Sequence, residues 1–296
     1  MRKPPRYLLG PKTLIVERKQ AKLLKTWGVE GFETSDDAHG RHLAMLRRFT
    51  RRGIKFKRRK AFAECYPNGN CKDVSRCPAA CHHASRRERA RLIVRLNQRL
   101  RDVGDPAWLI TVVRDRWRQA PGDLHHCDPA SLLKWFCRRL ERLPNPGLAK
   151  GIVGVDVSLN EDGDERWWQP HLHAVVAGVD KAALRKALKL KSTKSTVRPL
   201  VIIEIKRTDI GTTIGYALKR SVEKRVGYLD EEGERDQRTV RVPARFLVEH
   251  DRWLLGQKVT KRFRVIRMRL SRAPLVDETS IRPLRKRPLR RIRRRS

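Results

Sequence analysis

The sequence predicts an α+β fold in which helices pack on one side of an antiparallel sheet. Segments whose apolar residues repeat with a period of two alternate along the chain with segments of helical periodicity. Two of the strand-like segments are separated only by a short polar loop, which is typical of an antiparallel hairpin. With 296 residues, the chain can form one large domain or two smaller ones, each with its own core.

The N-terminal third of the chain is strongly basic and is predicted to contain two helices. Residues 1–64 are rich in Lys and Arg, and we expect a helix over 36–50 within them. A second, basic amphipathic helix is predicted over 85–101, with Ser85 as its N-cap. The Gly-Asp-Pro sequence at 104–106 ends this helix.

The central part of the chain carries the alternating pattern that defines the fold class. Apolar residues with period two predict strands, and amphipathic segments predict helices. The predicted strands span 107–114, 151–160, 171–178 and 200–206, and the predicted helices span 129–143, 180–190 and 209–226.

The C-terminal part is predicted to add a small extension and a tail. An acidic run at 229–236 is expected to be a loop, followed by a helix near 244–255 and a strand near 261–270. Residues 282–296 contain no acidic residue, and their Arg-rich composition predicts a disordered segment that binds polyanions. These features divide the chain into a basic N-terminal region (1–64), a zinc-binding and basic-helix segment (65–101), a central domain (105–228), a C-terminal extension (229–275) and a disordered Arg-rich tail (276–296).

The charge of the chain indicates a nucleic-acid partner. It contains 70 Lys and Arg against 32 Asp and Glu, a formal net charge of +38 at pH 7. Such a surface attracts polyanions in a salt-dependent way. No apolar run is long enough to span a membrane, and the N-terminal residues lack the apolar stretch of a secretory signal. We therefore expect a cytoplasmic protein with reduced cysteines and no membrane partner.

Four cysteines lie close together in the sequence and predict a structural zinc site. Cys65, Cys71, Cys77 and Cys81 follow the spacing C-x5-C-x5-C-x3-C, within basic segments that also contain Pro, Asn and Gly. The spacing differs from the C-x2-C pairs of common zinc knuckles, so four unrelated thiols are the alternative. A zinc-stabilised module beside basic helices would suit a reader of duplex DNA.

The segment 151–178 predicts a second metal site. Alternation along its two strands places aliphatic side chains on one face, and it places Asp156, His171 and His173 together on the other. Two imidazole nitrogens and a carboxylate suit Mn²⁺ or Mg²⁺ when positions remain open for water and phosphate. The alternative is a chance His-x-His pair on a solvated strand. Glu204, in the strand VIIEIK, is the rival third ligand.

The helix predicted over 209–226 carries a tyrosine outside the core. Its aliphatic residues form one stripe, whereas Tyr216, Lys219 and Glu223 lie on the opposite side, and Gly227 is suited to end the helix. A phenol is a poor nucleophile at neutral pH unless a nearby cation stabilises the phenolate. Lys219, three residues away, could supply that cation. The alternative is an exposed tyrosine on an amphipathic helix.

These residues carry a family pattern. WWQPHLHAVVAG resembles the His-hydrophobe-His motif of rolling-circle replication initiators in the HUH endonuclease superfamily, and GYALKRS resembles their Tyr-x-x-Lys motif. WLITVV and GIVGVDVSLN resemble the strands that precede the histidines in single-tyrosine plasmid initiators. The resemblance covers about residues 107–226. The chain departs from the pattern at Asp156, where Glu is expected.

The resemblance implies an HUH endonuclease domain over 105–228 with a Mg²⁺ or Mn²⁺ ion held by His171, His173 and Asp156. It implies that Tyr216, assisted by Lys219, nicks one strand of a single-stranded or hairpin plasmid origin, leaving a 5′-phosphotyrosine and a free 3′-OH. Duplex origin repeats and the host helicase and polymerase are the expected partners. Trp167 and Trp168 either stack on unpaired bases or fill the core.

Two other functions agree with the same sequence. A transposase or relaxase of a mobile element, also of the HUH type, would have the same histidines and tyrosine. A basic zinc-containing protein that binds nucleic acid without catalysis would explain the charge equally well. Only a nuclease of the proposed kind would remain covalently attached to a single-stranded oligonucleotide.

Overall fold

A mainly antiparallel sheet organises the protein. The computed structural model describes residues 32–55, 77–104, 106–193, 196, 198–229 and 235–268. Within these residues seven strands form one sheet in the order β4-β1-β3-β2-β5-β6, with β7 also paired to β2. Only the β2–β5 pair is parallel. The strands are β1 (Ala107–Val113), β2 (Lys150–Asp162), β3 (Glu165–Ala177), β4 (Leu200–Glu204), β5 (Glu223–Leu229), β6 (Arg235–Val240) and β7 (Phe263–Ile266).

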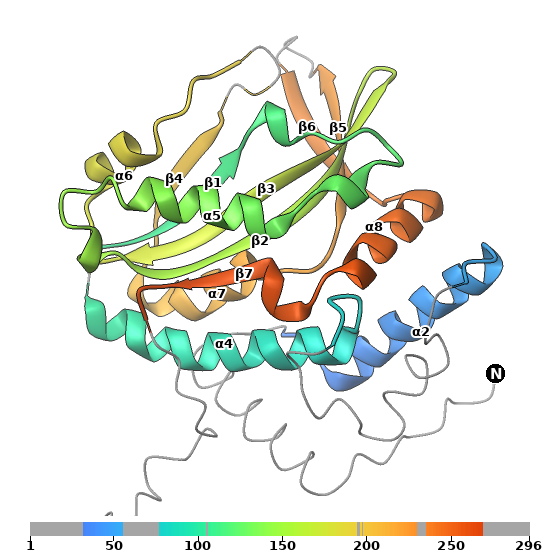
Figure 1. Ribbon diagram of the computed structural model, residues 1–296, viewed down its shortest axis with the longest axis horizontal. Coiled ribbons are helices and arrows are strands. Elements are labelled where there is room, and N and C mark those ends of the chain that lie inside the picture. Colours follow the sequence, from blue (N-terminus) through green and yellow to red (C-terminus); the bar gives the residue numbers. More distant parts are fainter. Residues whose placement is uncertain are drawn as a thin grey trace, which may run out of the picture.

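Helices cover both faces of the sheet, as Figure 1 shows. The described α-helices are α2 (Ser35–Arg51), α4 (His82–Val103), α5 (Pro129–Leu140), α6 (Lys181–Leu188), α7 (Ile210–Ala217) and α8 (Ala244–Gly256). Residues of α5 and α6, such as Phe136 and Leu188, share a core with Val153 and Leu172 of the sheet. Residues of α4 and α7 share another core with Ile152 and Val175, which point the opposite way. The prediction of helices on one side only is therefore wrong, because both strands of the β2–β3 hairpin carry apolar side chains on both faces.

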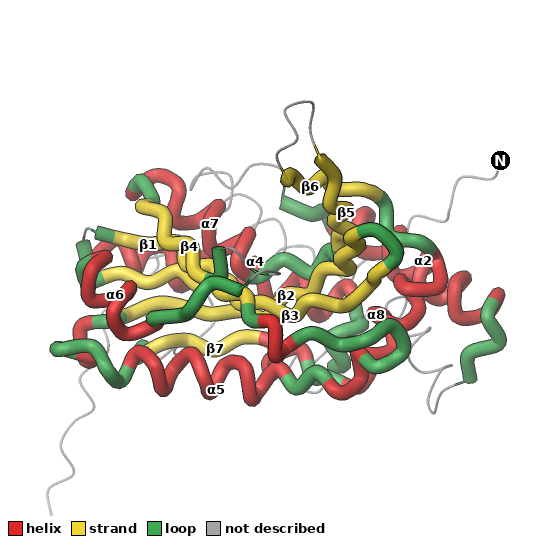
Figure 2. The backbone as a smooth tube through the Cα atoms, turned by 90° about the horizontal axis from the view of Figure 1, so that it is seen from above, coloured by secondary structure: helices red, strands yellow, loops and turns green. Residues whose placement is uncertain are grey.

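A third core joins the N-terminal and C-terminal parts of the chain. Side chains of α2 and α8 pack with Trp168 and with Cys81, at the half of the hairpin nearest its turn. Figure 2 shows α8 and α2 together at one end of the molecule. Strands β6 and β7, from the predicted C-terminal extension, join the central sheet.

Most predicted elements are present, with corrected boundaries at β3 and α4. The predicted α+β class is confirmed, and α2, α4, α5, α6, α8, β1, β2 and β4 lie at or near their predicted positions, whereas β3 begins at Glu165 rather than at 171. Helix α4 begins at His82 rather than at 85, and its N-cap is Cys81, whose Sγ accepts a hydrogen bond from the Ala84 amide. Ser85 is buried within the helix, and its hydroxyl donates to the Ala79 carbonyl. The predicted N-cap role of Ser85 is therefore wrong.

The predicted helix over 209–226 is wrong in its second half. Helix α7 ends at Ala217, and β5 begins at Glu223. Strand β5 pairs in parallel with β2, from Ser158 opposite Glu223 to Glu161 opposite Val226. Pairing with β5 gives hydrogen-bond partners to the backbone groups on the edge of β2 that does not face β3. If the helix continued to 226, those groups would have no partner from this segment. Gly227 therefore lies in a strand. Of the acidic run predicted to be a loop over 229–236, Leu229 ends β5 and Arg235 and Asp236 begin β6, while 230–234 lie outside the described residues.

Candidate functional site

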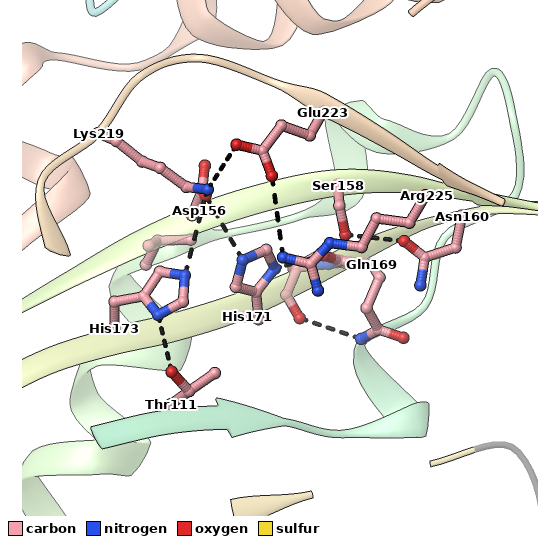
Figure 3. Close-up of polar contacts among 12 residues, drawn as sticks. Thr111, Asp156, Ser158, Asn160, Gln169, His171, His173, Lys219, Glu223 and Arg225 are labelled. Atoms are coloured by element: carbon pink, nitrogen blue, oxygen red, sulfur yellow. Dashed lines mark hydrogen bonds and ion pairs between the residues drawn. The ribbon is translucent and has the colours of Figure 1, made fainter. Parts of the chain in front are cut away.

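The structure brings the two predicted histidines and Asp156 together. In the β2–β3 ladder Asp156 lies opposite His171, and Gly154 lies opposite His173, so all three polar side chains occupy one face. They are almost fully buried. Asp156 Oδ2 is 3.4 Å from His171 Nε2 and 4.0 Å from His173 Nε2. Figure 3 shows both rings beside the Asp156 carboxylate. One ligand atom from each residue lies within 4.8 Å of the other two, a spacing that suits a single metal ion.

The outer ring nitrogens of both histidines already have partners. His171 Nδ1 is 2.9 Å from the Gln169 backbone carbonyl, which can only accept, so Nδ1 carries the proton. His173 Nδ1 is 3.0 Å from the Thr111 hydroxyl on β1. Metal-binding histidines are commonly oriented through their second nitrogen in this way. This arrangement leaves Nε2 of each ring to face the interior of the site.

The inward-facing nitrogens lack the partners that buried polar atoms require. Within the described part of the chain, neither Nε2 has a hydrogen-bond partner. If neutral, each imidazole presents a lone pair to the Asp156 carboxylate, and the groups then repel one another unless a cation lies between them. The donor set of two nitrogens and one carboxylate oxygen therefore fits a divalent metal ion.

The pKa shifts agree with this donor set. Burial and the neighbouring His171 lower the pKa of His173 to about 3, which keeps the ring neutral at pH 7 and able to bind a metal. Burial alone would raise the pKa of Asp156, but His171, Lys219 and His173 together hold it below the ordinary value. Asp156 is therefore ionised at neutral pH.

Tyr216 lies at the rim of this site. Its ring centre is 4.8 Å from that of His173, and 41% of the residue is exposed, which confirms that it lies outside the core. Lys219 Nζ lies 4.9 Å from the Tyr216 ring centre. Lys219 follows the end of α7 in a turn, with its amide donating to the Tyr216 carbonyl. The two side chains are therefore neighbours, as predicted, through a turn rather than through a helix.

Lys219 links the tyrosine to the buried carboxylate. Its Nζ is 3.4 Å from Asp156 Oδ2 and donates to Glu223 Oε1 at 3.0 Å (Figure 3). Burial opposes its charge, but Asp156 and Glu223 raise the pKa of Lys219 above the ordinary value. The ammonium group is therefore charged over the whole physiological pH range, beside both the tyrosine and the candidate metal ligands.

The end of α7 can approach β2 closely because residue 154 is glycine. A Cβ atom at Gly154 would lie 2.3 Å from the Ala217 carbonyl oxygen, well inside van der Waals contact. Ala217 immediately follows Tyr216 in the chain. The smallest residue type at position 154 thus sets the distance between the tyrosine and the histidines.

We expect Gly154→Ala to displace the end of α7, to destabilise the protein by about 1–3 kcal/mol and to abolish any reaction that depends on Tyr216. Urea unfolding measures the loss of stability, as a lower free energy of unfolding. Gly147→Ala is the control, because a Cβ there meets nothing within 4 Å. A Gly154→Ala protein as stable and as active as the wild type would contradict this role.

The remaining predicted residues lie elsewhere. Glu204 is exposed on the edge strand β4, opposite Trp108, and does not join the histidines. Trp168 is fully buried and fills the core, whereas the ring of Trp167 lies 4.4 Å from the Arg118 guanidinium. A second group of possible ligands, Asp123, His125 and His126, is exposed to solvent, unlike the buried histidine pair.

The predicted zinc site is only partly within the described residues. Cys65 and Cys71 lie outside them. Cys77 is half-buried just before α4, and Cys81 is buried at its N-cap.

Sequence reasoning missed three groups that complete the site. Thr111 and the Gln169 carbonyl orient the histidines, and Arg89 of α4 donates to the Gly215 carbonyl beside Tyr216. Thr111 is a polar residue within an apolar strand, which could have indicated a role. Arg89 lies far from Tyr216 in the sequence, within a basic helix, and no local pattern distinguishes it.

No protein-family model, curated protein or solved structure matches this chain. Among the described helices, none combines the length and apolar character needed to cross a membrane.

Proposed function

We propose that this protein is a metal-dependent endonuclease of the HUH class that nicks single-stranded DNA through Tyr216 and initiates rolling-circle replication of a plasmid. One observation carries the proposal. Two buried histidines with inward-facing Nε2 atoms and a buried carboxylate lie on one face of a hairpin, and a half-exposed tyrosine lies against one of them. Two histidines that only filled the core would need neither a buried carboxylate beside them nor a tyrosine against one ring.

The proposed site divides its roles among five residues. His171, His173 and Asp156 would hold Mg²⁺ or Mn²⁺, which when bound polarises a phosphate oxygen and stabilises the charge of the transition state. Tyr216 supplies the nucleophile. Lys219 holds a positive charge beside the phenol and favours its ionised form.

The proposed step exchanges one phosphoester bond for another. The Tyr216 oxygen loses its proton and forms a bond to phosphorus, while the bond from phosphorus to the 3′-oxygen breaks. The departing oxygen takes up a proton and becomes a 3′-OH, and the tyrosine carries the 5′-phosphate. Because the number of phosphoester bonds is unchanged, the strand can be rejoined later by the reverse reaction.

The role in replication is supported by the products and by the charge. A free 3′-OH can prime a polymerase, so a host polymerase and helicase are the proposed partners. The net charge of +38 suits binding to origin duplex as well as to the nicked strand. A transposase or relaxase would use the same step, and the DNA that surrounds the gene distinguishes these roles.

Incubation of the full chain with Mn²⁺ and pooled single-stranded oligonucleotides tests the proposal directly. We expect a protein–DNA adduct that survives SDS and a released fragment that a polymerase can extend. The absence of an adduct over a pool that includes the origin would overturn the proposal, and the non-catalytic binding protein would then be the better description.

We also propose that Cys77 and Cys81, together with Cys65 and Cys71, bind a structural zinc ion. Cys77→Ser and Cys81→Ser should each lower the zinc content of the purified protein from about one ion toward zero. Serine is itself a good N-cap, so Cys81→Ser preserves the start of α4 and isolates the effect on the metal. Cys137→Ser, a half-buried thiol on α5, is the control. Wild-type protein without zinc would contradict the proposal.

A further inference from the structure

A cleft of about 620 Å³ opens beside Tyr216, between α2, α4 and the end of α7. Its volume lies in the range of sites that enclose small molecules or single nucleotides. Most of the charged side chains that line it are basic, although Glu33 and Asp37 also contribute. The lining includes the aromatic and basic side chains of Phe32, Arg41, Arg89, Tyr216, Lys219 and Arg220.

Two arginines of this cleft have unsatisfied donors. Arg220 is only 8% exposed and donates one hydrogen bond, to the Ala80 carbonyl. Within the described residues, Nε and Nη1 of Arg220 and Nε of Arg89 are buried and have no hydrogen-bond partner. Arg89 pairs with Glu33 at 3.5 Å, whereas Asp251 and Glu33 act on Arg220 without forming a hydrogen bond to it within the described residues. A buried guanidinium whose donors lack hydrogen-bond partners is costly, and a bound anion that accepts from such donors would reduce that cost.

The charge of Arg220 persists despite its burial. Desolvation lowers the pKa of Arg220 to about 10, so the guanidinium remains protonated at neutral pH. Arginine also matches the two oxygens of a phosphate better than a lysine does, because its donors form a planar fork. The anion that this chemistry favours is therefore a phosphate group.

An aromatic ring lies in the same cleft. The Arg89 and Arg86 guanidinium carbons lie 5.3 Å and 5.9 Å from the centre of the Phe32 ring, which is half-buried. An aromatic face beside arginines is the arrangement that proteins use to stack an unpaired base next to its phosphate. The cleft thus offers both parts of a nucleotide-binding site.

We propose that this cleft binds one nucleotide of the single-stranded DNA next to the bond that Tyr216 attacks, with Arg89 and Arg220 contacting its phosphate and Phe32 stacking on its base. The proposal rests on the proposed nicking function, because Tyr216 is shared by the cleft and the metal-binding residues. A strand with one phosphate at Tyr216 extends naturally into the adjoining cleft. The proposed contact with the phosphate also gives a role to Arg89 of α4, which lies beside the tyrosine helix.

The test measures the affinity of the full chain for two fluorescent probes in the absence of divalent metal, so that no cleavage is needed. The probes are a twelve-residue oligothymidylate and an abasic strand of equal length. Arg89→Gln should weaken binding to both by about tenfold and lower the salt dependence by about one phosphate contact. Phe32→Ala should weaken binding to oligothymidylate by about tenfold and leave the abasic probe unaffected.

Arg185→Gln on α6, an exposed arginine on the opposite face of the sheet, is the matched control for charge and should change binding less than twofold. Arg89 and Phe32 are tested because neither is as deeply buried as Arg220, whose removal would also disturb packing. Circular dichroism checks that each variant is folded.

The outcomes separate this inference from the proposed function. If Arg89→Gln behaves like Arg185→Gln, or if Phe32→Ala weakens both probes equally, the cleft does not bind a nucleotide, even if wild-type protein forms an adduct. If both variants lose affinity as expected and wild-type protein forms no adduct with any strand, the cleft is a nucleotide site and the nicking function is wrong.

Discussion

Replacing Tyr216 with Phe should eliminate the covalent protein–DNA adduct and leave the fold unchanged. The substitution removes one oxygen atom, the proposed nucleophile, and retains the ring that lies 4.8 Å from His173 and 4.9 Å from the Lys219 ammonium. Phe is nearly isosteric with Tyr, and the residue is 41% exposed, so the free energy of unfolding should change by less than about 0.5 kcal/mol. Adduct formation should fall below detection.

Tyr228→Phe provides a matched control for this experiment. Tyr228 lies on β5 with 39% of its surface exposed, and its hydroxyl donates to Asp236 Oδ2. The same chemical change at this similar residue should leave adduct formation intact. Mass spectrometry of the wild-type adduct identifies the modified residue. Modification of Tyr228, Tyr66 or Tyr7 would disprove the assignment of Tyr216, and undiminished nicking by Tyr216→Phe without an adduct would disprove the initiator hypothesis.

Replacing either His171 or His173 with Ala should abolish nicking by more than about 100-fold, because loss of a residue that merely orients a metal ligand already costs 10–100-fold. Binding to duplex DNA should be almost unchanged, since it depends on many dispersed Lys and Arg residues. Metal content or Mn²⁺ titration of nicking, together with an electrophoretic binding assay, measures the two effects separately.

The exposed His125 is the control for the histidine variants. It belongs to the other group of possible metal ligands, with Asp123 and His126, and His125→Ala should nick DNA as the wild type does. A parallel loss of nicking and of DNA binding in His171→Ala would show that the buried histidines are structural. Nicking by His173→Ala at the wild-type rate would remove the metal site from the proposal.

The arrangement of the candidate metal ligands followed from the sequence alone. Side chains alternate strictly along a strand, so the period-two pattern of 151–178 placed His171, His173 and Asp156 on one face before any tertiary contact was known. The structure has the hairpin in that register, with Asp156 opposite His171. The net charge of +38 likewise depends only on composition.

The end of the tyrosine helix was decided by the tertiary structure. The pattern over 209–226 suits a helix, but residues 223–226 instead pair with β2, and Lys219 reaches Asp156 from the turn before them. Local periodicity carries no information about which strand edge lacks a partner. The backbone hydrogen bonds available at the free edge of β2 decide that residues 223–226 form a strand rather than a helix.

Contacts between distant segments decided the rest of the site. Glu204 is a plausible ligand by type, but its strand lies at the edge of the sheet, paired through β1, and the side chain is exposed. Arg89 reaches the Gly215 carbonyl from a helix that lies more than a hundred residues earlier in the chain. Sequence periodicity fixes which way a side chain points from its own element. Which elements meet at Tyr216 is set by how three apolar cores pack around one sheet, and that packing exists only in the folded chain.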